Sequence, residues 1–193
     1  MKKMLLGAVV GGFILFVWSF AAWVFLPLHT PHLHGIPNED TVISLLRSSL
    51  DKEAVYIFPH NPGMGADSAS MNLWMNKMKR GPAGLIIYTP NGSDPFMPGQ
   101  MLVGFILDII SAAIVAWFLL RSTALSSSYL ARVMYCGMFG IFVSFFTHLM
   151  NMNWMGYPLD FTTGLIIDGI VGWILAGFGI AAVIKTKPAP LPT

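Results

Sequence analysis

The sequence predicts an integral membrane protein that is mainly α-helical, with a four-transmembrane-helix bundle and a small α/β extramembrane domain inserted between helices 1 and 2. Hydrophobic residues make up 55% of the 193 residues, whereas charged residues make up only 10%. An ordinary soluble domain carries about 25% charged residues. A water-soluble chain of this length could not hide so much apolar surface, so lipid must cover part of it.

Four apolar stretches match the length of about 20 residues that a spanning helix needs. They cover residues 4–28, 101–120, 133–150 and 161–184. We expect the first to be kept as an anchor, because its apolar run is longer than the roughly 7–15 residues of a signal peptide. The predicted organisation is transmembrane helix 1 (1–28), an α/β domain (29–98), transmembrane helices 2–4 (99–184) and a tail (185–193).

The positive charges at the helix ends predict the orientation of the protein. An up-and-down path through four spans places six Lys and Arg residues on one side of the membrane: Lys2, Lys3, Arg121, Arg132, Lys185 and Lys187. Short cytoplasmic segments carry such an excess. We therefore predict a multi-pass protein of the bacterial inner (cytoplasmic) membrane, with both termini cytoplasmic and the α/β domain periplasmic.

The periplasmic domain is predicted to contain two helices and two strands. Residues 38–50 form the first helix, with Asn38 as N-cap, and residues 55–58 form a strand. A second helix starts at the cap Asp67, ends before Gly81-Pro82, and leads to a strand over 84–88. A parallel pair with a right-handed crossover is the default arrangement, and so small a sheet needs support from the membrane helices or a partner. Four large side chains on the second helix are expected to face a core rather than bind metal: Met71, Trp74, Met75 and Met78.

Two acids inside the spans are the most informative residues. Asp108 lies in the second span and Asp168 in the fourth. An ionisable group at such a depth is costly, and by default it marks a functional position or one with a buried partner. The third span places Ser144, His148 and Asn151 along one side at a similar depth. We predict one buried polar cluster from these five residues, which either holds helices together or binds protons, cations or a metal.

Small residues at four-residue spacing predict close helix packing. The first span contains the G-x-x-x-G pair Gly7 and Gly11. In the second span Gly104 shares a face with Asp108, and in the fourth Gly164 and Gly172 share a face with Asp168. We expect all five glycines to lie at helix contacts.

Three histidines follow the first span in an H-x-x-H-x-H pattern: His29, His32 and His34. Imidazoles this close together can bind copper, zinc or nickel. Pro31 and Gly35 indicate a loop rather than a rigid ligand face, so we expect the group to be dispensable for folding. The sequence assigns no cofactor.

The sequence contains none of the motifs H-E-x-x-H, G-x-S-x-G or the P-loop. The net charge of +2, without a basic run, argues against nucleic-acid binding. We expect a non-enzymatic accessory, assembly or scaffold subunit whose partners are the lipid bilayer and other membrane proteins or a second copy. The alternatives are a small transporter, channel or ion-responsive sensor using the Asp/Asp/His cluster, and a membrane enzyme or periplasmic metal-handling protein.

Overall fold

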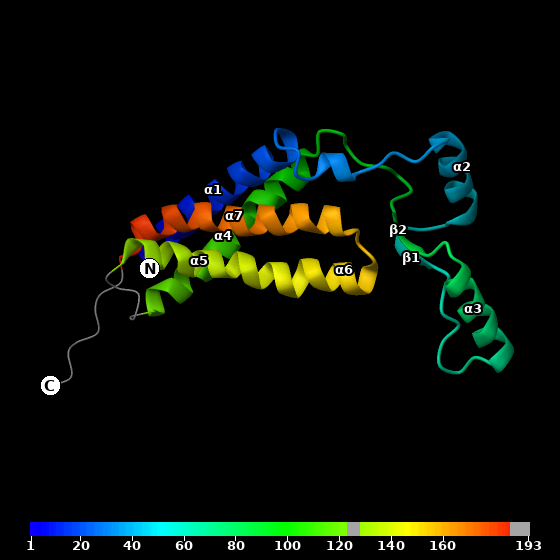
Figure 1. The fold of residues 1–193 in the computed structure, drawn as a ribbon. Coiled ribbons are helices and arrows are strands. Elements are labelled where there is room, and N and C mark those ends of the chain that lie inside the picture. Colours follow the sequence, from blue (N-terminus) through cyan, green and yellow to red (C-terminus); the bar gives the residue numbers. More distant parts are fainter. Residues whose placement is uncertain (123–127, 186–193) are drawn as a thin grey trace. The chain divides into compact units, whose positions relative to one another are not determined.

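The computed structural model describes residues 1–122 and 128–185, and its largest part is a set of four long helical spans (Figure 1). Each span is long and apolar enough to cross a membrane, which confirms the prediction of a mainly helical, multi-pass membrane protein. The third span is a succession of three helical segments. The spans are α1 (Lys2–Val24), α4 (Pro98–Arg121), α5 (Tyr129–Val143) continued by the π-helix η3 (Ser144–Leu149) and by α6 (Met150–Met155), and α7 (Leu159–Val183).

The third span is longer than its hydrophobic pattern indicated, because polar residues at both of its ends are also helical. Ser128 is the N-cap of α5, and its hydroxyl accepts a hydrogen bond from the Ala131 backbone N–H at 3.2 Å. The helix then continues past Asn151 to Met155. A span located only by its run of apolar residues is too short, because the capping and polar residues at its ends are left out although they belong to the helix.

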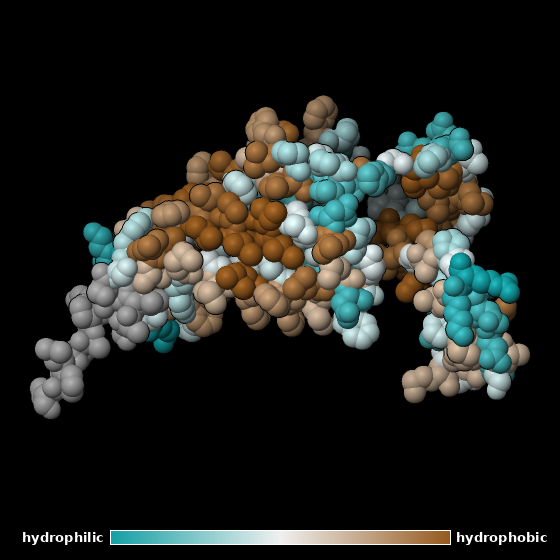
Figure 2. Space-filling view, viewed as in Figure 1, coloured by the Kyte–Doolittle hydropathy of each residue, from teal (hydrophilic) through white to brown (hydrophobic). Residues whose placement is uncertain are grey.

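The spans pack through small residues, while their outer sides carry large apolar residues. Helix α1 packs against α4 and α7, and α5 packs against α7. The buried core between them is built from small and aliphatic side chains: Leu15, Ala112, Ala116, Cys136, Ala176 and Ile180. Figure 2 shows hydrophobic residues covering much of the visible side of these helices. Such exposed apolar surface is what a lipid-facing helix requires.

Four of the five predicted packing glycines lie at close contacts within the bundle, although Gly164 meets the segment after α1 and not a helix. A Cβ atom at Gly7 or Gly11 would approach Ile184 or Ile180, and one at Gly164 or Gly172 would meet Leu28 or Trp18.

Gly104 differs from this expectation, because no atom of another described segment lies within 4 Å of the place where its Cβ would be. At 3.6 residues per turn, a face drawn through every fourth residue drifts by about 40° each time. Gly104 is eight residues from the buried Ala112, and therefore about 80° off the packed side of α4.

Residues 35–95 form a second compact unit, which contains α2 (Glu39–Ser49), β1 (Ala54–Phe58), α3 (Ser68–Arg80) and β2 (Gly84–Tyr88). The histidine segment predicted to belong to it, residues 29–34, instead groups with the membrane helices. Asp67 caps α3 by accepting the Ser70 backbone N–H at 2.8 Å, a bond that lowers the pKa of this carboxyl. Asn38 occupies the N-cap position of α2, but its side chain forms no capping bond.

The two strands are antiparallel, so the predicted parallel crossover is wrong. Ala54 pairs with Tyr88 and Phe58 with Gly84, and α3 therefore lies within one long hairpin connection. Parallel sheets are found almost only with both faces covered, whereas an antiparallel pair can leave one face open. Here one face stays open, because Val55, Ile57 and Ile87 are all exposed.

The second unit contains no buried residue anywhere between positions 35 and 95. The face of α3 that was expected to be a core is only partly covered, since Met71 and Trp74 are partly buried while Met75 and Met78 are exposed. The unit thus has regular secondary structure without a fully buried hydrophobic core of its own.

Candidate functional site: a buried polar cluster

A histidine and an aspartate form the centre of the cluster. The His29 Nε2 atom lies 3.0 Å from Asp168 Oδ2. The His29 side chain is fully buried and that of Asp168 is 15% exposed. A hydrogen bond in such surroundings is stronger than one in water, and this contact joins the segment after α1 to the middle of α7.

Two tryptophans of α1 hold this pair in place. The ring of Trp23 stacks on that of His29, with centroids 4.0 Å apart and an angle of 12° between the planes. Trp18 Nε1 donates a hydrogen bond to the backbone carbonyl of Asp168 at 3.0 Å. Gly172 makes this possible, because a Cβ there would lie 2.8 Å from Trp18 Cδ1. The indole ring of Trp18 occupies the space that a side chain at Gly172 would need.

The second acid and the third span's histidine meet Asp168 at one pocket. Asp108, His148 and Asp168 all line a cavity of about 310 Å³ within the bundle, together with Ser111 and Trp18. A Cβ added at Gly169, the neighbour of Asp168, would lie 3.8 Å from His148 Nε2. Residues from α1, α4, α7 and the third span thus line one cavity, which brings two acids and a histidine together among apolar side chains.

The third span brings His148 to the cavity through its π-helical segment. Ser144, the first residue of η3, is buried, and its hydroxyl donates to the Gly140 carbonyl at 2.7 Å. Such a bond to the carbonyl four residues earlier often bends a helix, and π-helical turns occur frequently at functional sites. Ser144 lies beside Gly169, whereas Asn151 is partly buried and does not line the cavity.

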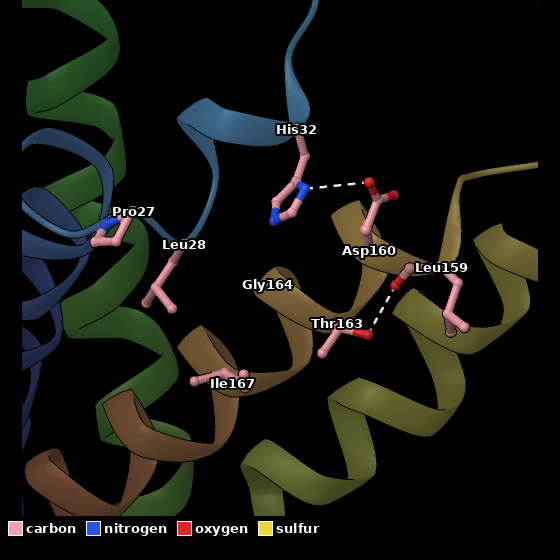
Figure 3. Close-up of a pocket in the computed structure, with 8 residues that line it drawn as sticks. All are labelled: Pro27, Leu28, His32, Leu159, Asp160, Thr163, Gly164 and Ile167. Atoms are coloured by element: carbon pink, nitrogen blue, oxygen red, sulfur yellow. Dashed lines mark hydrogen bonds and ion pairs between the residues drawn. The ribbon is translucent and has the colours of Figure 1, made fainter.

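A second polar contact lies at the start of α7. His32 Nδ1 is 3.2 Å from Asp160 Oδ2, and Figure 3 shows the two side chains pointing toward each other above a pocket of about 680 Å³. Leu28 and Ile167 line the same pocket from the helical bundle. Asp160 is 56% exposed, so this pair is open to solvent and contributes less than the buried one.

The three histidines after the first span do not gather around a common point. His29 contacts Asp168, His32 contacts Asp160, and His34 is exposed. Within residues 1–122 and 128–185, no three side chains of His, Cys, Asp or Glu lie close enough to hold a metal ion. The buried position of His29 also speaks against the expectation that the group is dispensable for folding.

Sequence reasoning missed His29 as a member of the cluster, and it missed Trp18, Trp23 and Ser111. His29 stood in a loop pattern with two other histidines, which concealed its burial. The available signal was the length of the first apolar stretch. A helix needs about 20 residues to cross the membrane, and residues 4–28 exceed that length, so the segment directly after α1 can fold back against the neighbouring spans.

No protein-family model, curated protein or solved structure matches the chain. The fold and the cluster define a multi-pass helical membrane protein with a polar cavity inside its bundle.

Proposed function

We propose that this protein is a non-enzymatic accessory or assembly subunit that works by binding another protein of the membrane, or a second copy, through residues 35–95. The observation that carries the proposal is the absence of any buried residue in this unit. A two-stranded hairpin alone is marginally stable at best in water. A protein surface that covered it would supply the missing core.

The apolar side of the hairpin is the surface that such a partner would cover. Val55 is 62% exposed and Ile87 is 73% exposed, and the register places these two residues opposite each other. Ile57 extends the same face. Burial of apolar area contributes about 25 cal/mol per Å², so a partner that covers these side chains gains affinity from them.

Photocrosslinking tests the proposal in native membranes. A photoreactive amino acid replaces Val55 or Ile87 in the full chain, and a third variant carries it at the exposed, polar Lys52 as the matched control. We expect the first two positions to give a protease-sensitive adduct of one discrete mass, and Lys52 to give none. Equal labelling from all three positions, or adducts with lipid alone, would contradict the proposal.

We further propose that residues 35–95 lie in the periplasm of a bacterial inner membrane and that both termini are cytoplasmic. The support is the excess of Lys and Arg at one end of the spans, where Lys2, Arg121, Arg132 and Lys185 occur. Reporter fusions at Asn91 should report the periplasm, and fusions at Ser126 and the C-terminus, which lie outside the described residues, should report the cytoplasm. A cytoplasmic signal from Asn91 would reverse the orientation.

A second candidate function is the binding or transport of a small solute or ion by the buried cluster. It is favoured by the convergence of Asp108, His148 and Asp168 on one cavity. Ionisable residues inside membrane bundles commonly mark such paths.

A further inference from the structure

Helices α4 and α5 share few contacts, although each packs closely on another helix of the bundle. The space left between them is a groove of about 740 Å³. Its lining is almost wholly apolar and includes five aromatic side chains. The lining includes Ile114, Phe118, Met138, Phe139, Phe142 and Trp173.

The groove adjoins the cavity that contains the two acids. Ser111, Val143 and Trp173 line both the apolar groove and the cavity that contains Asp108, His148 and Asp168. Ile114 and Phe142 on the groove walls are exposed on the outside of the bundle. Because both helices are membrane spans, that outside faces lipid, and a molecule dissolved in the bilayer can enter the groove from the side.

The charges in the cavity indicate which polar head group a bound molecule would carry. Asp168 already has His29 as its partner, whereas Asp108 forms no hydrogen bond in the part of the chain that the structure describes. A carboxylate without a partner is costly inside a membrane. A positively charged N–H donor would give Asp108 a charge-assisted hydrogen bond of the strong kind. The His148 ring and the neutral hydroxyls of Ser19 and Ser111 line the same cavity, and a hydroxyl gives a weaker bond than a charged donor.

The groove's lining decides what kind of tail follows that head group. The lining is almost wholly apolar and the groove is open along one side. A flexible alkyl chain can lie along such a surface, and its burial there is favourable.

We propose that the groove and cavity together form a binding site for a membrane-dissolved primary amine, with its ammonium on Asp108 and its alkyl tail between α4 and α5. This site is separate from the hairpin surface of residues 35–95, so either proposal can fail without the other.

Native mass spectrometry of the full chain in detergent tests the site with two probes of the same chain length. Dodecylamine carries N–H donors, whereas dodecyltrimethylammonium has the same charge and none. We expect one dodecylamine per chain, bound at least tenfold more tightly than the quaternary amine. Equal affinity for the two probes would overturn the proposal, because it would indicate partition without recognition.

Three variants locate the binding. Asp108→Asn should weaken dodecylamine binding at least tenfold, since the amide lacks the negative charge. Ile114→Trp should fill the groove and weaken binding similarly, whereas Ile106→Trp should bind like the wild type. Ile106 and Ile114 are both on α4 and are 47% and 51% exposed, but only Ile114 lines the groove. Unchanged binding by Asp108→Asn, or equal effects of the two Trp variants, would overturn the site; thermal melts confirm that each variant is folded.

Discussion

Replacing Asp168 with Leu should destabilise the membrane bundle by about 1–3 kcal/mol, the usual cost of leaving a buried hydrogen-bonding group without its partner. Asp168 is the only hydrogen-bond partner of the His29 ring among the described residues, and that ring is fully buried between Trp23 and α7. The substitution leaves a polar ring in an apolar environment. Thermal unfolding of the full chain in detergent measures the effect.

Two companion variants separate this explanation from a general sensitivity of α7. Asp168→Asn should be tolerated in the melt, because the amide oxygen still accepts a bond from the imidazole N–H. The double variant with His29→Leu and Asp168→Leu should recover part of the loss, since no unpaired polar group remains.

Asp160→Leu serves as the matched control on the same helix. It removes the carboxylate from a solvent-exposed His–Asp pair and should change the melting temperature little. Equal melting temperatures for Asp160→Leu and Asp168→Leu would contradict the claim that the buried His29–Asp168 pair stabilises the bundle.

The Asn variant also distinguishes the two roles that the cluster could have. A cluster that only holds helices together works as well with an amide as with an acid. A cluster that carries protons or cations needs the ionisable group, so Asp168→Asn would lose activity in a growth or transport assay while its melting temperature stays close to that of the wild type.

Gly12→Leu should have the second large effect, because it forces α1 and α4 apart. A Cβ at Gly12 would lie 2.6 Å from the Cα atom of Ile109 and 2.7 Å from its backbone nitrogen. A flexible side chain can move aside, but a helix backbone cannot do so without separating the helices. Inserting atoms into a well-packed core lowers the stability by about 1–3 kcal/mol, and by more where the neighbouring atoms cannot move aside.

Gly104→Leu is the matched control for this change. It places the same side chain in the membrane-spanning part of α4, at a glycine that has nothing within 4 Å of its Cβ position. The gain in helix propensity is the same in both variants, so the difference between their melting temperatures reports packing alone. A Gly104→Leu variant as unstable as Gly12→Leu would show that the contact at Gly12 is not the cause.

The sequence alone predicted the four spans and most helix and strand positions, because each depends on local patterns. The hydrophobic runs, the cap at Asp67 and the stop at Gly81 all act within a few residues. The strand direction was wrong because it depends on which faces are covered, and no pattern within residues 54–58 or 84–88 records that. Gly104 was assigned to a contact for a related reason: spacing gives a helix face, but not the position of the neighbouring helix.

The candidate site was predictable in part. Asp108, Asp168 and His148 stood out because charged or titratable groups are rare inside spans. His29 did not, because its burial depends on a fold-back onto Gly164, where a side chain would overlap the Leu28 carbonyl oxygen. A contact between residues 139 positions apart leaves no trace in a single sequence.

The most direct test of the proposed partner-binding role is hydrogen–deuterium exchange at the paired amides of β1 and β2. The chain is compared as a purified monomer and in native membranes, with the amides of the four spans as internal reference. Without a core of its own, the hairpin should exchange nearly as fast as an unfolded chain in the monomer and be strongly protected in the membranes. Protection in the monomer that equals that of the spans would contradict the account, because it would show that residues 35–95 are stable without a partner.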